Sequence, residues 1–265
     1  MARGEGGPQE PSHFPAPTTF LGLIANSLRL YRLAPRTLIF TFLTLGIFEA
    51  VLRFSSAGIA DAVESASLDL AFGLVIPVVI AVTAGSLGVA IAGVVMADRL
   101  AGKATTARDV LRSGFPMREV LASGLFASII ALVLAVVLAP IILLTLVMFF
   151  GPPVVVQVIA LEHDGLQPAL SRARAMSKGN LGRLVGILFA VALGTGLLHF
   201  MLTQVGFGLT DPLEEWAQGA IVLGFSILVQ AVLYPYVAAA GLIAYLDVRA
   251  RFEDFGADDL RTERS

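Results

Sequence analysis

The stretch LAFGLVIPVVIAVTAGSLGVAIAGVVMA, residues 70–97, decides the fold class of this chain. It contains no charged side chain, and an apolar helix of about 20 residues is long enough to cross the hydrocarbon core of a bilayer. The rest of the sequence is similar: 57% of the 265 residues are hydrophobic and only 14% are charged, whereas soluble domains average about 25% charged. We therefore expect an all-α, polytopic integral membrane protein.

The basic residues predict how the chain is threaded through the membrane. Of the 18 Lys and Arg residues, 17 fall in four groups that flank long apolar stretches, and positive charge resists translocation out of the cytoplasm. The groups are Arg3, Arg29, Arg32 and Arg36; Arg99, Lys103, Arg108, Arg112 and Arg118; Arg172, Arg174, Lys178 and Arg183; and Arg249, Arg251, Arg261 and Arg264. Each apolar stretch must then cross twice, which predicts six transmembrane helices in the cell membrane with both termini cytoplasmic.

The expected crossings are residues 38–52, 70–97, two within 120–161, 184–203 and 217–246, the last with a kink at Pro235. An outer loop is expected over 54–69, with a short helix within it as an option. Residues 120–161 carry no charge, so their division is open: the flanking basic groups favour a hairpin turning near Ala139 and Pro140, and a re-entrant segment is the alternative. Pro152 and Pro153 then fall within the fourth helix. Irregular backbone at that depth must be covered by protein or line a cavity.

An amphipathic basic segment precedes each pair of crossings on the cytoplasmic side. In the second segment, Thr106 and Asp109 have the spacing of a capping box. In the third, Pro168 suits the first helical turn and Gly179 suits the end of the helix. Such helices lie in the membrane interface, so the expected partners are anionic lipid headgroups.

Small residues at every fourth position let helix backbones approach closely. They recur in the second and fifth crossings, at Ala84, Gly88 and Ala92, and at Gly182, Gly186, Ala190 and Gly194. We expect these two helices inside the bundle, and the alternative is that the pattern only reflects an Ala- and Gly-rich composition.

Three regions follow from composition. Residues 1–17 are polar and rich in Gly and Pro, which predicts a disordered tail. Residues 18–252 form the expected six-helix domain, and residues 253–265 form a flexible acidic tail that folding does not require.

The sequence offers little for catalysis. It has no cysteine and three histidines, and neither His163 nor His199 has a second metal ligand at helical spacing. Phosphate-binding loops and nucleophile motifs are missing as well. Glu162, His163 and Asp164 fit a polar turn at a helix end, and an acid–base cluster is the alternative. We expect no enzyme, no catalytic residue, no cofactor, no metal and no nucleic-acid partner.

Polar residues inside apolar helices are the candidates for function, because the membrane makes them costly. Four candidates for a ligand cavity are Gln157, His199, Gln230 and Tyr234, and interhelical hydrogen bonding is the alternative. A second set lies at the cytoplasmic helix ends and predicts a structural ion-pair network: Glu162, Arg172, Asp247 and Arg249. We expect Glu162 and Asp247 to pair with Arg172 or Arg249 and so to tie the fourth and sixth helices together.

Two stretches resemble the glycerophosphoryl diester phosphodiesterase membrane-domain family. The segment PVVVQVIALE (153–162), the segment ALSR (169–172) and the segment KGN (178–180) are similar to the family's PVVVLE, ALRRS and KG, and AYLDVRAR (244–251) is similar to its closing YYDLRxR. Ala173 departs from the family's usual Ser, and residues 252–254 depart from its KEG. Over residues 18–255, the resemblance implies a stand-alone membrane domain without the soluble phosphodiesterase domain that gives the family its name.

We expect a non-enzymatic multi-pass membrane protein that serves as a scaffold or accessory subunit in envelope or lipid-related processes, with a protein partner or a second copy. The alternative is a small transporter or lipid-binding carrier with a cavity near Pro152 and Pro153. An intramembrane enzyme acting on lipids is the least favoured of the three. The excess of Arg over Lys, sixteen to two, is typical of a GC-rich bacterial genome.

Overall fold

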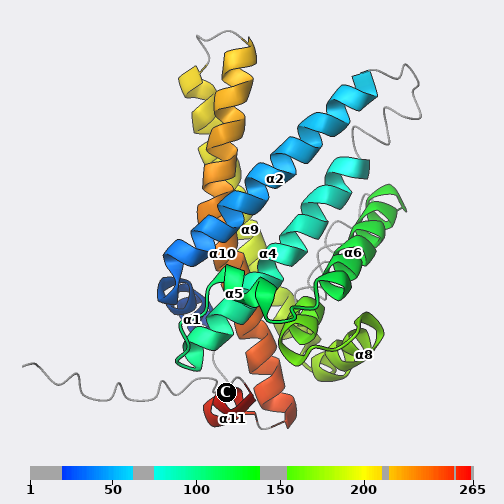
Figure 1. Cartoon of the computed structure of the whole chain (residues 1–265), viewed down its shortest axis with the longest axis vertical. Coiled ribbons are helices and arrows are strands. Elements are labelled where there is room, and N and C mark those ends of the chain that lie inside the picture. Colours follow the sequence, from blue (N-terminus) through cyan, green and yellow to red (C-terminus); the bar gives the residue numbers. More distant parts are fainter. Residues whose placement is uncertain (1–19, 62–74, 138–153, 211–214, 254, 264–265) are drawn as a thin grey trace, which may run out of the picture.

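The computed structural model describes residues 20–61, 75–137, 154–210, 215–253 and 255–263, and every regular element in these ranges is a helix (Figure 1). The helices are α1 (Phe20–Leu33), α2 (Pro35–Asp61), α4 (Ile76–Leu100), α5 (Ala107–Arg112), α6 (Met117–Val137), α8 (Leu166–Ser177), α9 (Leu181–Thr210), α10 (Glu215–Glu253) and α11 (Ala257–Glu263). Residues 154–162 are also helical. The expected all-α class is confirmed.

Three of the described helices are long and apolar enough to cross a membrane: Pro35–Leu52 within α2, Ile76–Leu100 and Ala217–Glu253 within α10. They overlap the first, second and sixth expected crossings. Large apolar side chains such as Phe40, Phe48 and Met201 point outward from the bundle, which suits a lipid environment. Apolar helices of this length are typical of a membrane protein.

Helix ends differ from the expected ends of the crossings. The outer loop expected over residues 54–69 begins as helix, because α2 continues to Asp61, and α10 continues through Pro235 to Glu253. The physical reason is that a change from apolar to polar residues marks the edge of the bilayer, whereas a helix ends only where its backbone bonding ends. The expected turn at Ala139 and Pro140, and Pro152 and Pro153, lie outside the described residues, as does the segment 1–17.

The helices pack most tightly at one end of the bundle. In Figure 1, α1, α5, α8 and α11 gather around this end, whereas α2 and the α9–α10 pair diverge toward the other. Fully or nearly buried residues run from Ala90 to Asp98 in α4, from Val154 to Ala160, and from Ala238 to Ala250 in α10. Because α1, α5 and α8 also carry exposed arginines, we call this the basic end.

Helix α10 is the axis of the packing. It contacts α9 along its length and also α1, α2 and α4, and α4 in turn contacts α2 and α6. The run of small residues Ala238–Ala240 is buried, which allows neighbouring helices to lie close to the α10 backbone. The basic end is therefore assembled around the last half of α10.

The two ladders of small residues behave differently. In α4, a Cβ added to Gly88 would stand 2.7 Å from the Phe42 ring, so the expected close approach occurs there, against α2. In α9, a Cβ added to Gly182, Gly186 or Gly194 would meet nothing within 4 Å. The prediction that the α9 ladder packs against another helix is not met within the described part of the chain.

The C-terminal segment also differs from expectation. Residues 253–265 were expected to form a flexible acidic tail, but residues 257–263 form α11, and Phe255 and Leu260 are buried against the bundle. The Gly256 amide donates a 2.7 Å hydrogen bond to the Asp259 carboxylate at the start of the helix. Asp258 and Asp259 are exposed, so they lie on the outer side of a helix that has its own apolar face.

Candidate functional site

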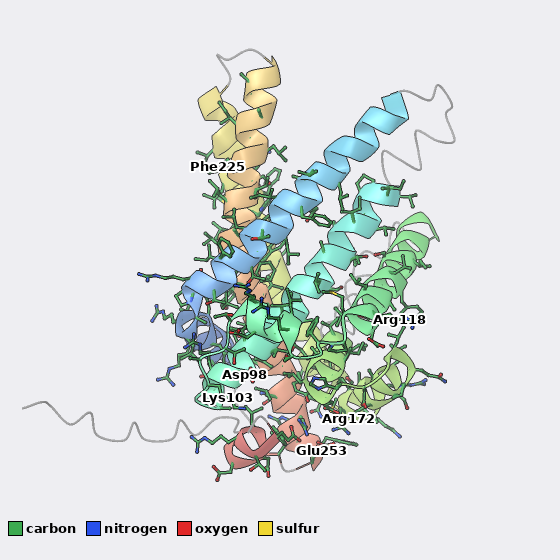
Figure 2. The ribbon with its side chains drawn as sticks, in the orientation of Figure 1. Asp98, Lys103, Arg118, Arg172, Phe225 and Glu253 are labelled. Atoms are coloured by element: carbon green, nitrogen blue, oxygen red, sulfur yellow. The ribbon has the colours of Figure 1, made fainter. Side chains whose placement is uncertain are left out.

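A cluster of charged side chains lies at the basic end, where four elements meet. Tyr245, Arg249 and Glu253 are four residues apart in α10 and so share one face of that helix. Glu162 joins them from the end of segment 154–162. The other members, Arg172 and Glu263, come from α8 and α11; Figure 2 labels Arg172 and Glu253. We call this set of six side chains the Arg249 cluster.

Arg249 is the centre of the cluster, and its side chain is only 7% exposed. Its two terminal nitrogens bind both carboxylate oxygens of Glu263, at 2.9 and 2.5 Å. Its Nε donates to Glu253 at 3.0 Å and its Nη1 to the Tyr245 hydroxyl at 3.1 Å. The Phe255 ring covers the guanidinium at 3.8 Å. A buried charge is tolerated only when paired and hydrogen-bonded in this way.

Glu162 and Arg172 close the cluster into a ring. Glu162 accepts a 2.6 Å hydrogen bond from the Tyr245 hydroxyl, forms an ion pair with Arg172 and lies 3.9 Å from Arg249. Arg172 also pairs with Glu253 at 2.7 Å. Burial alone would lower the pKa of Arg172, but the hydrogen bonds and negative charges of Glu162 and Glu253 outweigh it and raise that pKa. Two arginines thus hold three glutamates from three elements.

The structure departs from expectation at Asp247. This buried carboxylate pairs with Arg183 in the first turn of α9 and with Arg251, both at 3.2 Å. Asp247 lies two residues from both Tyr245 and Arg249, and residues at that spacing point to different sides of a helix. Asp247 therefore ties α10 to α9, whereas the Arg249 cluster ties α10 to α8, α11 and segment 154–162.

Sequence reasoning missed four members of these two ion-pair systems: Tyr245, Glu253, Glu263 and Arg183. The four-residue spacing from Arg249 could have indicated Tyr245 and Glu253. Glu263 gave no such signal, because a short acidic segment after the last apolar helix has the composition of a solvated tail.

The four ligand-cavity candidates lie in separate places. Gln157 is fully buried, and its Nε2 donates to the Val89 carbonyl in α4 at 3.1 Å. Its Oε1 is buried without a hydrogen-bond partner among the described residues. A Cβ on Gly93 would overlap this amide, so glycine is needed at that position. Gln157 therefore joins segment 154–162 to α4.

The other three candidates contact neighbouring helices near the middle and far part of the bundle. His199 Nε2 lies 3.3 Å from the Ser226 hydroxyl, between α9 and α10. Tyr234 meets the Phe42 ring edge-on at 6.3 Å, and the Gln230 amide faces Gly46, both across the α10–α2 contact. These side chains and Gln157 do not converge on one cavity, and they fit the alternative of contacts between helices.

Local turns agree with the sequence. Thr106 and Asp109 form the expected capping box at the start of α5, and Gly179 has a φ of +88° just beyond α8. The hydrogen bonds from Thr106 lower the pKa of Asp109. His163 is exposed, has a φ of 59° and follows the last residue of the helical segment 154–162. Glu162, His163 and Asp164 thus include the turn that ends this helix.

Among the described residues, no group of three or more His, Asp or Glu side chains is placed to hold a metal ion. Comparison of the chain with protein-family models, with curated proteins and with solved structures returns no match. The resemblance to the glycerophosphoryl diester phosphodiesterase membrane-domain family therefore stays a prediction.

Arg249→Gln should lower the thermal stability of the protein in detergent strongly. Removing one partner of a buried ion pair costs about 3–5 kcal/mol, and because the partners Glu253 and Glu263 are 27% and 45% exposed, we expect a cost at or below the low end of this range. Arg261→Gln is the matched control: Arg261 makes an exposed pair with Asp258 in α11, and such pairs contribute at most about 1 kcal/mol. Equal melting temperatures for the two variants would show that the Arg249 cluster is not structural.

A double-mutant cycle separates the two ion-pair systems. Asp247→Asn combined with Arg183→Gln should give a coupling energy of about 0.5–3 kcal/mol in unfolding experiments, as expected for side chains in contact. Asp247→Asn combined with Arg172→Gln should be additive, because Asp247 pairs with Arg183 of α9, whereas Arg172 of α8 pairs with Glu162 and Glu253. Coupling in the second pair and additivity in the first would contradict this arrangement.

Proposed function

We propose that this chain is a non-enzymatic multi-pass protein of the cell membrane that acts as a scaffold or accessory subunit in envelope or lipid-related processes. In this proposal the chain crosses the bilayer six times, with both termini cytoplasmic. The basic end faces the cytoplasm, and α1, α5 and α8 lie in the membrane interface.

The observation that carries the proposal is the Arg249 cluster. Its charged groups bind one another and join α10, α8, α11 and segment 154–162 at one end of the bundle. Charges used in this way fix the relative positions of helices. A protein that presents a fixed surface to a partner needs this kind of rigidity, because a preorganised surface loses less entropy on binding.

The surface of the basic end supports a role at the membrane face. Exposed basic side chains project from three separate helices there: Arg29 and Arg32 from α1, Arg108 and Arg112 from α5, and Arg174 from α8. Each Lys or Arg near an anionic bilayer surface contributes about 1 kcal/mol of attraction. The exposed apolar side chains Phe200 and Met201 on α9 suit lipid or another transmembrane helix.

The topology can be tested directly because the chain contains no cysteine. In cells, Lys103→Cys and Lys178→Cys should react with a membrane-impermeant maleimide only after permeabilisation, since both lie in basic groups at the cytoplasmic side. Gln204→Cys, an exposed position at the far part of α9, should react in intact cells. Labelling of Lys103→Cys and Gln204→Cys from the same side would contradict the proposed crossings.

The scaffold role is tested by native mass spectrometry of the protein released from nanodiscs made with lipids of its host. We expect a stoichiometric second protein or a second copy of this chain to remain bound. A retained small molecule that is lost in Gln157→Ala would instead support the carrier alternative. Arg261→Gln serves as the control for non-specific effects of substitution.

A further inference from the structure

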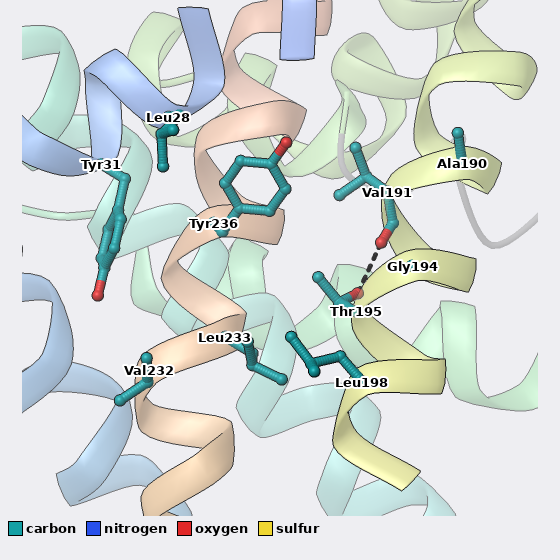
Figure 3. A pocket seen from close by; sticks show the side chains of 10 residues that line it. All are labelled: Leu28, Tyr31, Ala190, Val191, Gly194, Thr195, Leu198, Val232, Leu233 and Tyr236. Carbon is teal, nitrogen blue, oxygen red and sulfur yellow. Dashed lines mark hydrogen bonds between the residues drawn. The ribbon is translucent and has the colours of Figure 1, made fainter. Parts of the chain in front are cut away.

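An apolar groove of about 420 Å³ opens between α1, α9 and α10 (Figure 3). We call it the α9 groove. Its walls include Leu28 and Tyr31 from α1, Gly194 and Leu198 from α9, and Tyr236 from α10. The volume is within the range of about 300–1,000 Å³ found for sites of small ligands. The α9 groove is therefore large enough for a ligand, and its chemistry is that of hydrocarbon.

The one hydroxyl on the α9 wall does not change this character. Thr195 Oγ1 donates a 2.7 Å hydrogen bond to the Val191 carbonyl of its own helix, the dashed line in Figure 3. The methyl group of Thr195 and the side chain of Val191 remain for contact with an occupant. An apolar molecule, or the apolar part of an amphipathic one, fits this lining.

The α9 groove exists because the α9 ladder has no helix packed on it among the described residues. A Cβ added to Gly194 would meet nothing within 4 Å, whereas a Cβ added to Gly88 in the α4 ladder would stand 2.7 Å from the Phe42 ring. In the first case small residues leave space, and in the second a neighbouring side chain fills it.

Positive charge lies on α1, next in sequence to the two α1 residues that line the α9 groove. Arg32 lies one helical turn after Leu28 and next to Tyr31, so it shares the groove side of α1. Arg29 and Arg32 are both exposed. Within the described ranges neither makes an ion pair with a carboxylate, in contrast to Arg172 and Arg249. Tyr31 and Tyr236, both half-buried, are of the residue type that collects at the level of lipid headgroups.

We propose that the α9 groove binds one acyl chain of an anionic phospholipid, and that Arg32, assisted by Arg29, binds its phosphate. The apolar lining accounts for the chain, and the free arginines beside it account for the charge of the headgroup. This site rests on the part of the proposed function that places α1 in the membrane interface, and it does not depend on the scaffold role.

A second groove provides an internal comparison. It measures about 410 Å³ and is lined by apolar residues of α2, α4 and α6, among them Phe48, Ile80 and Leu125. The α1 arginines do not adjoin it. On our proposal this second groove takes acyl chains without regard to headgroup, and only the α9 groove selects negative charge.

The test uses the full chain in phosphatidylcholine nanodiscs that contain a phosphatidylglycerol with a photoreactive group on one acyl chain. Cross-linked peptides identified by mass spectrometry should include peptides from α1, α9 and α10, besides those from the second groove. Gly194→Leu adds a side chain to a lining position of the α9 groove whose Cβ would stand in open space, and it should remove most of the product at α1, α9 and α10. Gly196→Leu is the matched control, because Gly196 also has open space around it but does not line the α9 groove.

The headgroup assignment is tested in the same nanodiscs by competition between phosphatidylglycerol and phosphatidylcholine. Arg32→Gln should reduce the preference for phosphatidylglycerol at α9 about fivefold, the effect of one basic side chain at an anionic surface. Arg112→Gln on α5 should leave that preference unchanged.

Three results would overturn the proposal. Equal cross-linking in Gly194→Leu and Gly196→Leu would show that the acyl chain does not lie in the α9 groove. An unchanged lipid preference in Arg32→Gln would show that Arg32 does not bind the phosphate. Efficient disulfide formation between two Gly194→Cys chains in the membrane would show that a second copy covers the α9 groove instead. The site would be established if cross-linking at α1, α9 and α10 is kept in wild type and Gly196→Leu but lost in Gly194→Leu, and if Arg32→Gln, but not Arg112→Gln, reduces the preference for phosphatidylglycerol.

Discussion

The rest of the structure depends on the burial of one positive charge, that of Arg249, near the end of the longest helix. A guanidinium in this position destabilises the bundle unless carboxylates and hydrogen-bond acceptors surround it. The chain supplies them from α11 and segment 154–162 as well as from α10 itself. Elements far apart in the sequence must therefore meet at this point: Glu263 of α11 binds Arg249 directly, and Arg172 of α8 binds the carboxylates of Glu162 and Glu253 that surround it.

The packing of the two ends of α10 follows from this constraint. Near Arg249 the helix is enclosed, with Tyr245 and Leu246 fully buried, whereas Ile221 and Leu228 in its other half are about half exposed. Small residues allow close packing only where a partner helix is held against them, as Phe42 is against Gly88. On α9 the same kind of residue faces open space and forms a groove. A ladder of small residues thus permits another helix to approach closely, and the neighbouring elements determine whether a side chain or open space lies against it.

Much of the fold could be predicted from the sequence, because its main determinant is composition. The apolar stretches gave the all-α class, and short-range rules gave the capping box of Thr106 and the left-handed Gly179. Helix ends were misplaced, since polarity marks the bilayer edge and not the end of backbone bonding. The two-residue offset of Asp247 from Arg249 could have indicated that these two side chains point to different sides of the helix, although it did not identify Arg183 as the partner. The contact of Glu263 with Arg249 could not, since it depends on how a short segment folds back on the bundle.

The basic residues that set the predicted topology fall into two physical classes. Arg172, Arg183 and Arg249 are paired with carboxylates from other elements, where low water content limits screening by salt. Arg29 and Arg32 are exposed and carry no such partner in the described part of the chain, so their attraction to an anionic surface weakens as ionic strength rises. The paired arginines therefore hold the helices together, whereas the exposed arginines at the same end of the bundle are available to bind lipid. Because salt screens the exposed arginines more than the paired ones, the fold can be stable at an ionic strength that releases a bound headgroup. Lipid at the α9 groove can then exchange without disturbing the Arg249 cluster.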